Sequence, residues 1–447
     1  MIARPPAAAP RPYRFPDFAR HRLDNGLSVW LVPLRDRELV SVQLLTDAGA
    51  AAEDEPAGGV AALTAQLLVT GTERLDASAF AETTERLGIE VSSESSWDSA
   101  RAGFVALGEH LEAGLALLAE MIRTPRLDNG EFDRLKAERL NEILQSRADP
   151  GRLADESFLR ELFADGVPYG RVSGGTPETV EGLTVDDARA FHATRYAPGT
   201  AHLILAGAFD EADALSAIER QLGDWRGAAS GHRTIEPRTR AGRRVVLVDR
   251  PGSVQSELRV GHLGIDRHDP RMFPATVMAA LLGGVFGSRL NLRLREDLGY
   301  TYGARCSFDP RRAAGPFTAT AAVQTEVTAG AIRELLGQLD RIRDEAPGET
   351  ELAEVRDYLI GVFPLRFETT PGIAGAIEPL AVYGLPDDYW QTYREHIEAV
   401  RIADVQAVAR ELVRPDEALI LLTGDASRVR EELERAAFGP LRVIAAP

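Results

Sequence analysis

The sequence predicts an α+β protein built from two homologous lobes, and three observations lead to this prediction. The first is an internal repeat with a constant offset of 217 residues, which aligns Asp187 with Asp404 and Gly207 with Gly424. In each copy an amphipathic helix stops near a proline, and a buried strand ending in glycine follows. The second observation is that strands and long helices recur in the same order in both halves. The third is a polar run between the halves that has the composition of a linker.

The first half begins with an arm. Residues 1–20 contain five prolines and no apolar run long enough for a signal peptide or a membrane span, so we expect an extended segment leading to the first strand. Further along, the Glu-Arg-Leu-Gly stretch at 85–88 precedes a serine-rich alternating strand. The other elements expected in this half are strands at 27–32, 102–107 and 202–207 and helices at 111–122 and 183–191.

The second half repeats this order after a linker at 226–243. A Glu-Asp-Leu-Gly stretch at 296–299 again precedes strands, which we expect at 244–248, 300–308 and 317–324, with a helix at 329–342. Antiparallel strands mixed with long helices are typical of a sheet that helices cover on one face. The expected organisation is an arm at 1–20, a lobe at 21–225, a linker at 226–243 and a lobe at 244–447.

The charge of the chain excludes several classes of partner. The 447 residues include 51 basic and 68 acidic side chains, a formal net charge of -17. Duplex DNA and anionic membranes require a basic surface, so we expect neither nucleic acid nor membrane as the partner. The longest apolar runs have the length of strands, and we therefore expect a soluble, cytoplasmic protein.

Several kinds of catalytic site are also excluded. The single cysteine, Cys306, allows neither an intramolecular disulfide nor a cysteine-rich metal site. The single lysine, Lys136, lies outside any Gly-Lys-Ser/Thr loop, which excludes a P-loop. No Gly-x-Ser-x-Gly elbow is present, and the glycines at 283–288 are interpreted as a helix end and a turn.

A zinc site built from this chain alone is not expected either. None of the eight histidines belongs to a His-Glu-x-x-His or a His-x-x-Glu-His motif, either of which would place two imidazoles one helical turn apart beside a carboxylate. His262 and His268 are expected in a loop after a strand, as capping or turn residues. His192 and His202 fall on the packed helix and strand of the repeat.

From about His21 onward the chain resembles a subunit of the M16 family of metallopeptidases, the insulinase, pitrilysin and mitochondrial-processing-peptidase group. Residues 59–72 are similar to the family helix that carries His-x-x-Glu-His before a closing Gly-Thr. In that register Ala62, Ala65 and Gln66 replace the first histidine, the catalytic glutamate and the second histidine. Glu142, 76 residues beyond Gln66, matches the family's third zinc ligand. The resemblance therefore implies a degenerate zinc site, with Glu142 as a relic or a surface salt-bridge partner.

The second half is instead similar to the family's C-terminal motif, in which an arginine precedes a tyrosine by seven positions. Arg295 and Tyr302 satisfy this spacing in the register that keeps the neighbouring Arg-Glu and Gly-x-x-Tyr aligned, and Arg293 with Tyr300 has the same spacing in a poorer register. We expect Arg295 to close a helix and Tyr302 to open the next strand. The resemblance implies that Arg295, Tyr302 and Tyr300 bind substrate and that Arg295 and Tyr302 assist catalysis, because a guanidinium holds a carbonyl and a phenol donates to an oxyanion.

The resemblance also implies the M16 fold, which is shared with LuxS-like and processing-peptidase-like metallohydrolases, and a function that needs a second chain. The expected protein is a non-catalytic, substrate-binding subunit of a heterodimeric peptidase, whose homologous partner carries the zinc. No cofactor is expected in this chain, and the substrate would be a short or unfolded peptide. Two alternatives remain: an inactive peptide-binding or scaffold homodimer, and a partner subunit of a protease dedicated to maturing one ribosomal peptide.

Overall fold

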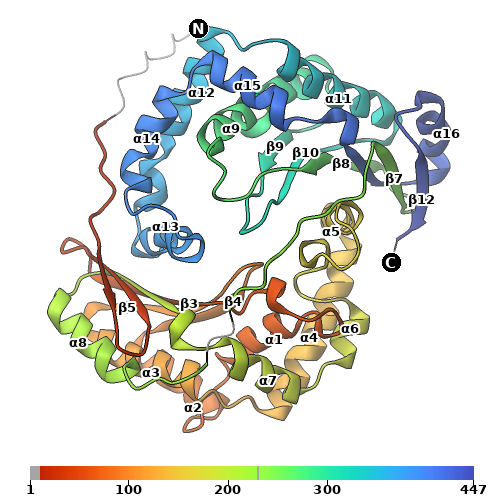
Figure 1. Cartoon of the computed structure of the whole chain (residues 1–447). Helices are drawn as coiled ribbons and strands as arrows, with labels where there is room; N and C mark the ends of the chain where they lie inside the picture. Colours follow the sequence, from red (N-terminus) through yellow and green to blue (C-terminus); the bar gives the residue numbers. More distant parts are fainter. Residues whose placement is uncertain (1–10, 229–230, 447) are drawn as a thin grey trace.

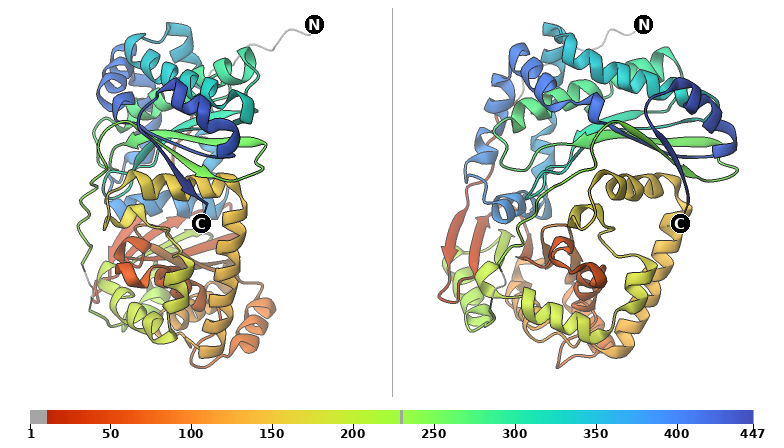
Figure 2. Two further views of the ribbon diagram at one scale, coloured as in Figure 1. Left: turned by 90° about the vertical axis from the view of Figure 1, so that its right-hand side faces the viewer. Right: turned by 45° about the vertical axis from the view of Figure 1, so that its right-hand side comes forward.

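A computed structural model describes residues 11–228 and 231–446, and these residues form two lobes that lie one above the other (Figure 1), as the two further views in Figure 2 also show. Each lobe contains one six-stranded mixed sheet with helices packed on it. The two lobes are similar in topology, as the repeat in the sequence predicts. The α+β prediction of two homologous lobes is confirmed.

The sheet of the first lobe has the strand order β1-β2-β6-β3-β5-β4. Parallel pairing of β2 with β6 is followed by antiparallel pairing of β6 with β3, β3 with β5 and β5 with β4. The strands are β1 (Ala19–Arg22), β2 (Ser28–Pro33), β3 (Leu39–Thr46), β4 (Glu90–Ser95), β5 (Ala100–Leu107) and β6 (His202–Gly207).

The sheet of the second lobe repeats this arrangement as β12-β7-β11-β8-β10-β9. Five of its six positions, including the edge strand β9, match those of the first sheet in both order and direction, and the two sheets differ at the other edge. There β1 runs antiparallel to β2, whereas β12 runs parallel to β7. The strands are β7 (Arg244–Asp249), β8 (Gln255–Leu263), β9 (Ala304–Phe308), β10 (Pro316–Gln324), β11 (Leu419–Gly424) and β12 (Leu441–Ala445).

Helices of the same half cover one face of each sheet, with α1 and α3 on the first sheet and α9 and α11 on the second. The first half contains α1 (Val60–Leu67), α2 (Ala77–Leu87), α3 (Leu111–Arg123), α4 (Asn129–Ala148), α5 (Pro150–Leu162), α6 (Pro177–Gly182), α7 (Val185–Arg195) and α8 (Glu211–Leu222). The second contains α9 (Met272–Ala279), α10 (Arg289–Asn291), α11 (Thr328–Asp344), α12 (Glu349–Val362), α13 (Thr370–Tyr383), α14 (Tyr389–Ala399), α15 (Ile402–Leu412) and α16 (Ala426–Ala436), with π-helical turns η6 (Ala280–Gly284) and η7 (Leu292–Asp297).

The opposite face of each sheet is covered by a helix from the other half, so the expectation that helices cover only one face was incomplete. Helix α13 packs on β3 and β6 of the first sheet, and α5 packs on β11 and β8 of the second, between the two sheets in Figure 1. Alternate residues of a strand point to opposite faces. In β2, for example, Val29 and Leu31 join the core of their own lobe, whereas Trp30 and Val32 join the core that contains α13. The lobes are therefore interlocked.

The N-terminal arm adds a further connection between the lobes. Residues 11–18 run along the helices of the second half, where Phe15 is buried with its ring centroid 5.1 Å from that of Phe367. The last residues of the predicted arm belong to strand β1, which the sequence analysis missed. Residues 1–10 of the arm lie outside the described residues.

One helical stretch is more apolar than the sequence analysis expected. Among the described residues, the helical stretch 272–297 is long and apolar enough, by length and composition alone, to cross a membrane. The expectation that the longest apolar runs have only the length of strands was therefore wrong here. In this fold 56% of its most apolar window is buried inside the protein. Met278, Leu282 and Leu290 of this stretch belong to the core of the second lobe, which accounts for its composition.

Candidate functional site

The first part of the site is helix α1, which corresponds to the predicted zinc helix. Gly59 precedes it with a left-handed φ of +99°, and an added Cβ there would lie 2.9 Å from the Gly174 carbonyl oxygen. The buried Glu53 carboxylate accepts hydrogen bonds from the backbone N–H groups of Gly59 (3.1 Å) and Ala61 (2.9 Å). Burial raises the pKa of Glu53 to about 7, although these two bonds oppose the rise. The helix is thus firmly capped at its start.

The three predicted zinc-site positions lie on α1, and none can bind zinc. Ala65 is fully buried, whereas Ala62 and Gln66 are partly exposed. Helix α1 packs against α4, which carries Glu142, so the fold brings the four positions onto two neighbouring helices. Zinc requires imidazole, thiolate or carboxylate ligands, and only Glu142 offers one. Within 11–228 and 231–446 no group of three or more His, Cys, Asp or Glu side chains is placed to hold a metal ion.

Glu142 is engaged on the surface of α4. Its carboxylate pairs with Arg139 at 3.0 Å, and its side chain is 51% exposed. It lines a groove of about 520 Å³ between α4 and α5, together with polar groups that include Ser146 and Arg152. The expected role of Glu142 as a surface salt-bridge partner agrees with this geometry.

The second part of the site is the segment from α10 to β9 in the second lobe. Arg295 lies in the π-helical turn η7, and the helix ends at Gly299, which has a left-handed φ of +65°. Tyr302 follows in an irregular loop and is 94% exposed. Strand β9 begins only at Ala304, so the prediction that Tyr302 opens the strand was wrong. The zinc-helix positions and the Arg/Tyr segment lie on different lobes of this chain (Figure 1).

The structure separates the two arginine-tyrosine pairs that have the same spacing. Arg293 binds Glu334 of α11 through two nitrogens, at 2.8 and 3.2 Å. Tyr300 packs against the core beside Gly330 of the same helix. Both residues of this pair therefore fasten the segment to α11. Tyr300 is only partly exposed, in contrast to Tyr302, and its expected substrate-binding role stays a prediction.

Arg295 has other partners, and Tyr302 is exposed. The Arg295 guanidinium lies 4.1 Å from the ring centroid of Phe286, an arrangement typical of a cation–π contact, and its Nε is 3.3 Å from Glu296. Phe286 is itself 70% exposed. An accessible guanidinium beside an exposed aromatic ring and an exposed phenol can bind a peptide by its carbonyl groups and apolar side chains.

Two features of this segment were missed by the sequence analysis. One is the pair of π-helical turns, η6 and η7, which occur often near functional sites but have no simple sequence signal. The other is the buried Asn291, whose side chain bonds to the backbone of Val285, just before the segment, and of Ala304, at the start of β9. The glycines at 283–288 form a helix end and a turn, as predicted, since η6 stops at Gly284 and α10 starts after Ser288.

Of the histidines named in the sequence analysis, His262 is buried, His192 and His202 are partly buried and His268 is exposed in a turn, and His262 lies elsewhere than predicted. His262 belongs to strand β8 rather than to a loop; it is buried, stacks on Phe317 and accepts a hydrogen bond from the Arg414 N–H at 2.9 Å. Burial lowers the pKa of His262 to about 4. His192 bonds to the Ile122 carbonyl on a helix, and His202 lies on strand β6, as predicted.

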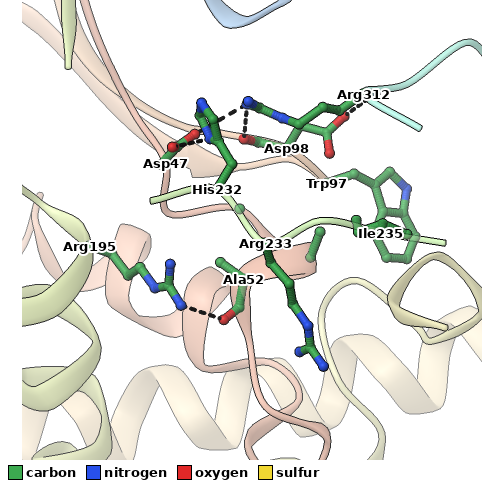
Figure 3. Close-up of a pocket in the computed structure, with 11 residues that line it drawn as sticks. Asp47, Ala52, Trp97, Asp98, Arg195, His232, Arg233, Ile235 and Arg312 are labelled. Atoms are coloured by element: carbon green, nitrogen blue, oxygen red, sulfur yellow. Dashed lines mark hydrogen bonds and ion pairs between the residues drawn. The ribbon is translucent and has the colours of Figure 1, made fainter. Parts of the chain in front are cut away.

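A polar recess between the lobes joins the linker to the fold (Figure 3). Asp98 accepts hydrogen bonds from Tyr169 (2.7 Å), Tyr383 (3.2 Å) and the Arg312 N–H (3.0 Å), while Asp47 pairs with Arg312 and with His232 of the linker. The recess has a volume of about 20 Å³, which is room for roughly one water molecule. The bonds of Arg312 to Asp47 and Asp98 hold the lobes together here. The recess itself is too small to bind a peptide side chain.

Comparisons with known proteins were consistent along the chain. Residues 32–167 match the family model for insulinase (peptidase family M16), and residues 182–359 match the model for the peptidase M16 inactive domain. A crystal structure of a peptidase M16 inactive domain from Pseudomonas fluorescens aligns with a TM-score of 0.86 and 25% identity, covering 92% of this chain and 98% of that one.

Two curated relatives bear different descriptions. A non-peptidase homolog from Helicobacter pylori is 24% identical over 81% of this chain and 84% of its own length. A protein from Mycobacterium tuberculosis described as an uncharacterized zinc protease is 27% identical over 91% of this chain and 92% of its own length. The similarity thus extends over nearly the whole chain in each case.

Proposed function

Because the chain consists of M16-family, insulinase-like domains, we propose that it is the non-catalytic subunit of a zinc-dependent peptidase made of two related chains. In this proposal a homologous partner carries His-x-x-Glu-His and binds the zinc. This chain supplies Arg295 and Tyr302 from the opposite wall of a shared chamber. The substrate is a short or unfolded peptide, and the pair acts in the cytoplasm.

One contrast carries the proposal. The helix that would hold zinc is intact in shape but has alanines at two of its functional positions and glutamine at the third. The Arg295/Tyr302 segment, in contrast, exposes both polar side chains, with 34% of the Arg295 side chain and 94% of Tyr302 accessible. An exposed tyrosine on a loop of a rigid scaffold has no packing role, which favours a role in binding.

The chemistry assigned to this chain is binding and charge stabilisation. Zinc in the partner would supply the activated water that attacks the peptide carbonyl. Arg295 is suited to hold a neighbouring carbonyl or the C-terminal carboxylate of the peptide, because a guanidinium offers several donors in one plane. The Tyr302 phenol donates a hydrogen bond to the carbonyl oxygen, on which negative charge develops as water attacks the carbonyl carbon.

The names of the relatives support a chain that is inactive alone. The Helicobacter pylori relative is described as a non-peptidase homolog, and the Pseudomonas fluorescens structure as an inactive domain. The Mycobacterium tuberculosis relative is described as an uncharacterized zinc protease. Both descriptions suit a family in which closely related chains divide the catalytic groups between them.

Reconstitution tests the proposal. The chain is purified alone, a homologue with His-x-x-Glu-His from the same organism is purified alone, and each is assayed on an unstructured fluorogenic peptide before and after mixing. We expect hydrolysis only from the mixture and its loss on chelation of zinc. Hydrolysis by the partner alone at the rate of the mixture would contradict the proposal.

The non-peptidase description also favours a second candidate, a scaffold homodimer that binds peptides without cleaving them. Copurification from the native host separates the two candidates. Recovery of this chain with a His-x-x-Glu-His chain supports the peptidase subunit. Recovery as a homodimer, with no activity when the homologue is added, supports the scaffold.

A further inference from the structure

We infer that Asn291 is the positioning residue that sets Tyr302 relative to Arg295, an inference that rests on the proposed function. Asn291 closes the short helix α10 and is only 8% exposed. Arg295 follows four residues later on the continuing helix, and Tyr302 lies beyond the turn at Gly299. The buried side-chain amide of Asn291 thus lies in the same segment as Arg295 and Tyr302, the two residues of the proposed site.

The hydrogen bonds of Asn291 connect three segments. Its Oδ1 accepts the backbone N–H of Ala304 at 2.9 Å, two residues after Tyr302. Its Nδ2 donates to the Val285 carbonyl and to the Ser288 Oγ, both at 3.2 Å, in the loop that carries Phe286. Because an amide has a donor end and an acceptor end, it can tie two backbone segments at once.

The chain around Tyr302 has few other restraints. Residues 299–303 belong to neither a helix nor a strand, and the hydroxyl of Thr301 bonds only locally, to Gly303. On the helical side the Tyr300 N–H is fixed by the Leu294 carbonyl at 2.8 Å. The Ala304 bond to Asn291, together with the pairing of Ala304 with Ala321 in the sheet, fixes the other side of the loop, so the Tyr302 backbone is held between two anchors.

The same amide acts on Arg295 through the loop. The Phe286 ring lies against the Arg295 guanidinium, and Asn291 binds the residue immediately before Phe286. Loss of Asn291 would release both the ring beside Arg295 and the backbone beside Tyr302. A displacement of about 1 Å of a catalytic group can lower the rate roughly a hundredfold, so this restraint matters for activity.

The test uses the reconstituted pair with Asn291→Ala and, as a milder change, Ser288→Ala. We expect Asn291→Ala to lower kcat by roughly 30- to 100-fold with a smaller change in KM, and Ser288→Ala by a few fold. In a Tyr302→Phe background Asn291→Ala should cost much less, because its effect on the phenol is already lost. The matched control is Gln406→Ala. Gln406 of α15 is another buried residue with a side-chain amide, which donates to backbone carbonyls of α11.

The outcomes are distinct. If Asn291→Ala lowers the melting temperature as Gln406→Ala does but keeps kcat within threefold, the positioning role is wrong. Equal losses in the wild-type and Tyr302→Phe backgrounds would also contradict it. If the pair with Arg295→Ala and Tyr302→Phe is fully active, the proposed function itself fails; if that pair is inactive while Asn291→Ala is active, only the role of Asn291 fails.

Discussion

The two lobes differ most clearly where the helical segment before the edge strand ends. This segment is α2 before β4 in the first lobe and η7 before β9 in the second. In both, the helix stops at a left-handed glycine, Gly88 with φ +60° and Gly299 with φ +65°. In the first lobe Val91, three positions later, already pairs with Phe104 in the sheet. In the second lobe Ala304, five positions later, occupies the equivalent place opposite Ala321. The second lobe therefore has two more residues between the glycine and the equivalent position of the edge strand.

These two residues explain why Tyr302 is accessible. Position 91 of the first lobe lies within its strand, whereas Tyr302 stands in the longer connection and is 94% exposed. The first lobe differs in its own region of interest, since α1 is capped and packed but carries alanine or glutamine at the positions that the resemblance assigns to the zinc site. The second lobe thus exposes its Arg/Tyr segment, whereas α1 of the first lobe offers no zinc-binding side chain at Ala62, Ala65 or Gln66, and the following changes test that comparison.

The largest expected effect is the restoration of zinc binding in the first lobe. Ala62→His with Gln66→His would place two imidazoles one helical turn apart on α1, beside α4 and Glu142. We expect about one zinc per chain with a Kd of roughly 1 μM or tighter, about 8 kcal/mol, measured by calorimetry. The same double variant with Glu142→Ala is the control, and equal zinc binding by both would show that Glu142 is not a ligand in this fold.

The next effect concerns the helices exchanged between the lobes. Phe158 on α5 and Ile377 on α13 are buried against the sheet of the opposite lobe. Substitution of either by alanine should lower the free energy of unfolding by about 3–4 kcal/mol, because it removes a large side chain from a packed core. Chemical denaturation measures this loss. A loss below about 1 kcal/mol for either variant would contradict the interlocked core.

A third test uses the pH dependence of the cap on α1. Burial raises the pKa of Glu53 to about 7 from an ordinary 4.5, so folding favours its protonated form. Its contribution to stability is full below about pH 4.5 and declines as the pH rises to about 7. Glu53→Gln keeps an acceptor for the helix and removes the titration. Relative to this variant, the wild-type protein should lose roughly 2–3 kcal/mol between these limits.

Urea unfolding of both proteins at pH 5 and pH 8 measures the difference. The stability advantage of Glu53→Gln should be larger at pH 8. An advantage that is constant with pH would mean that Glu53 does not titrate in this range.

The smallest effects distinguish Arg293 from Arg295. Arg293→Ala removes a two-point ion pair with Glu334 and should lower the melting temperature slightly while leaving the activity of the pair unchanged. Arg295→Ala should leave the melting temperature unchanged and lower the activity. Thermal unfolding and the peptide assay check both, and a reversal of the two results would assign the motif to Arg293.

Much of the fold followed from the repeat in the sequence, because the offset of 217 aligns β6 with β11 and thereby fixes equivalent cores. The exchange of α5 and α13 was not predictable in this way. An amphipathic helix reports that one face is buried, but not against which sheet. Strand β1 was missed because its four residues include two arginines and a histidine.

The candidate site was predictable in its residues but not in its geometry. Spacing alone offered Arg293 with Tyr300 and Arg295 with Tyr302, the register favoured the second pair, and the contact of the first pair with α11 separates the two in the fold. The strand expected at Tyr302 followed the pattern of the first lobe, which lacks the two extra residues. Asn291 was not found because a single asparagine in a helix gives no signal of its tertiary partners.

The most direct test of the account is the ratio of kcat/KM for the reconstituted pair with wild-type chain to that with Arg295→Ala and Tyr302→Phe together. We expect a ratio of at least about 100, since loss of one oxyanion donor alone costs roughly 100- to 1000-fold. The variant should still bind its partner and keep its melting temperature. A ratio near one, with partner binding intact, would contradict the claim that this chain supplies the Arg/Tyr half of the active site.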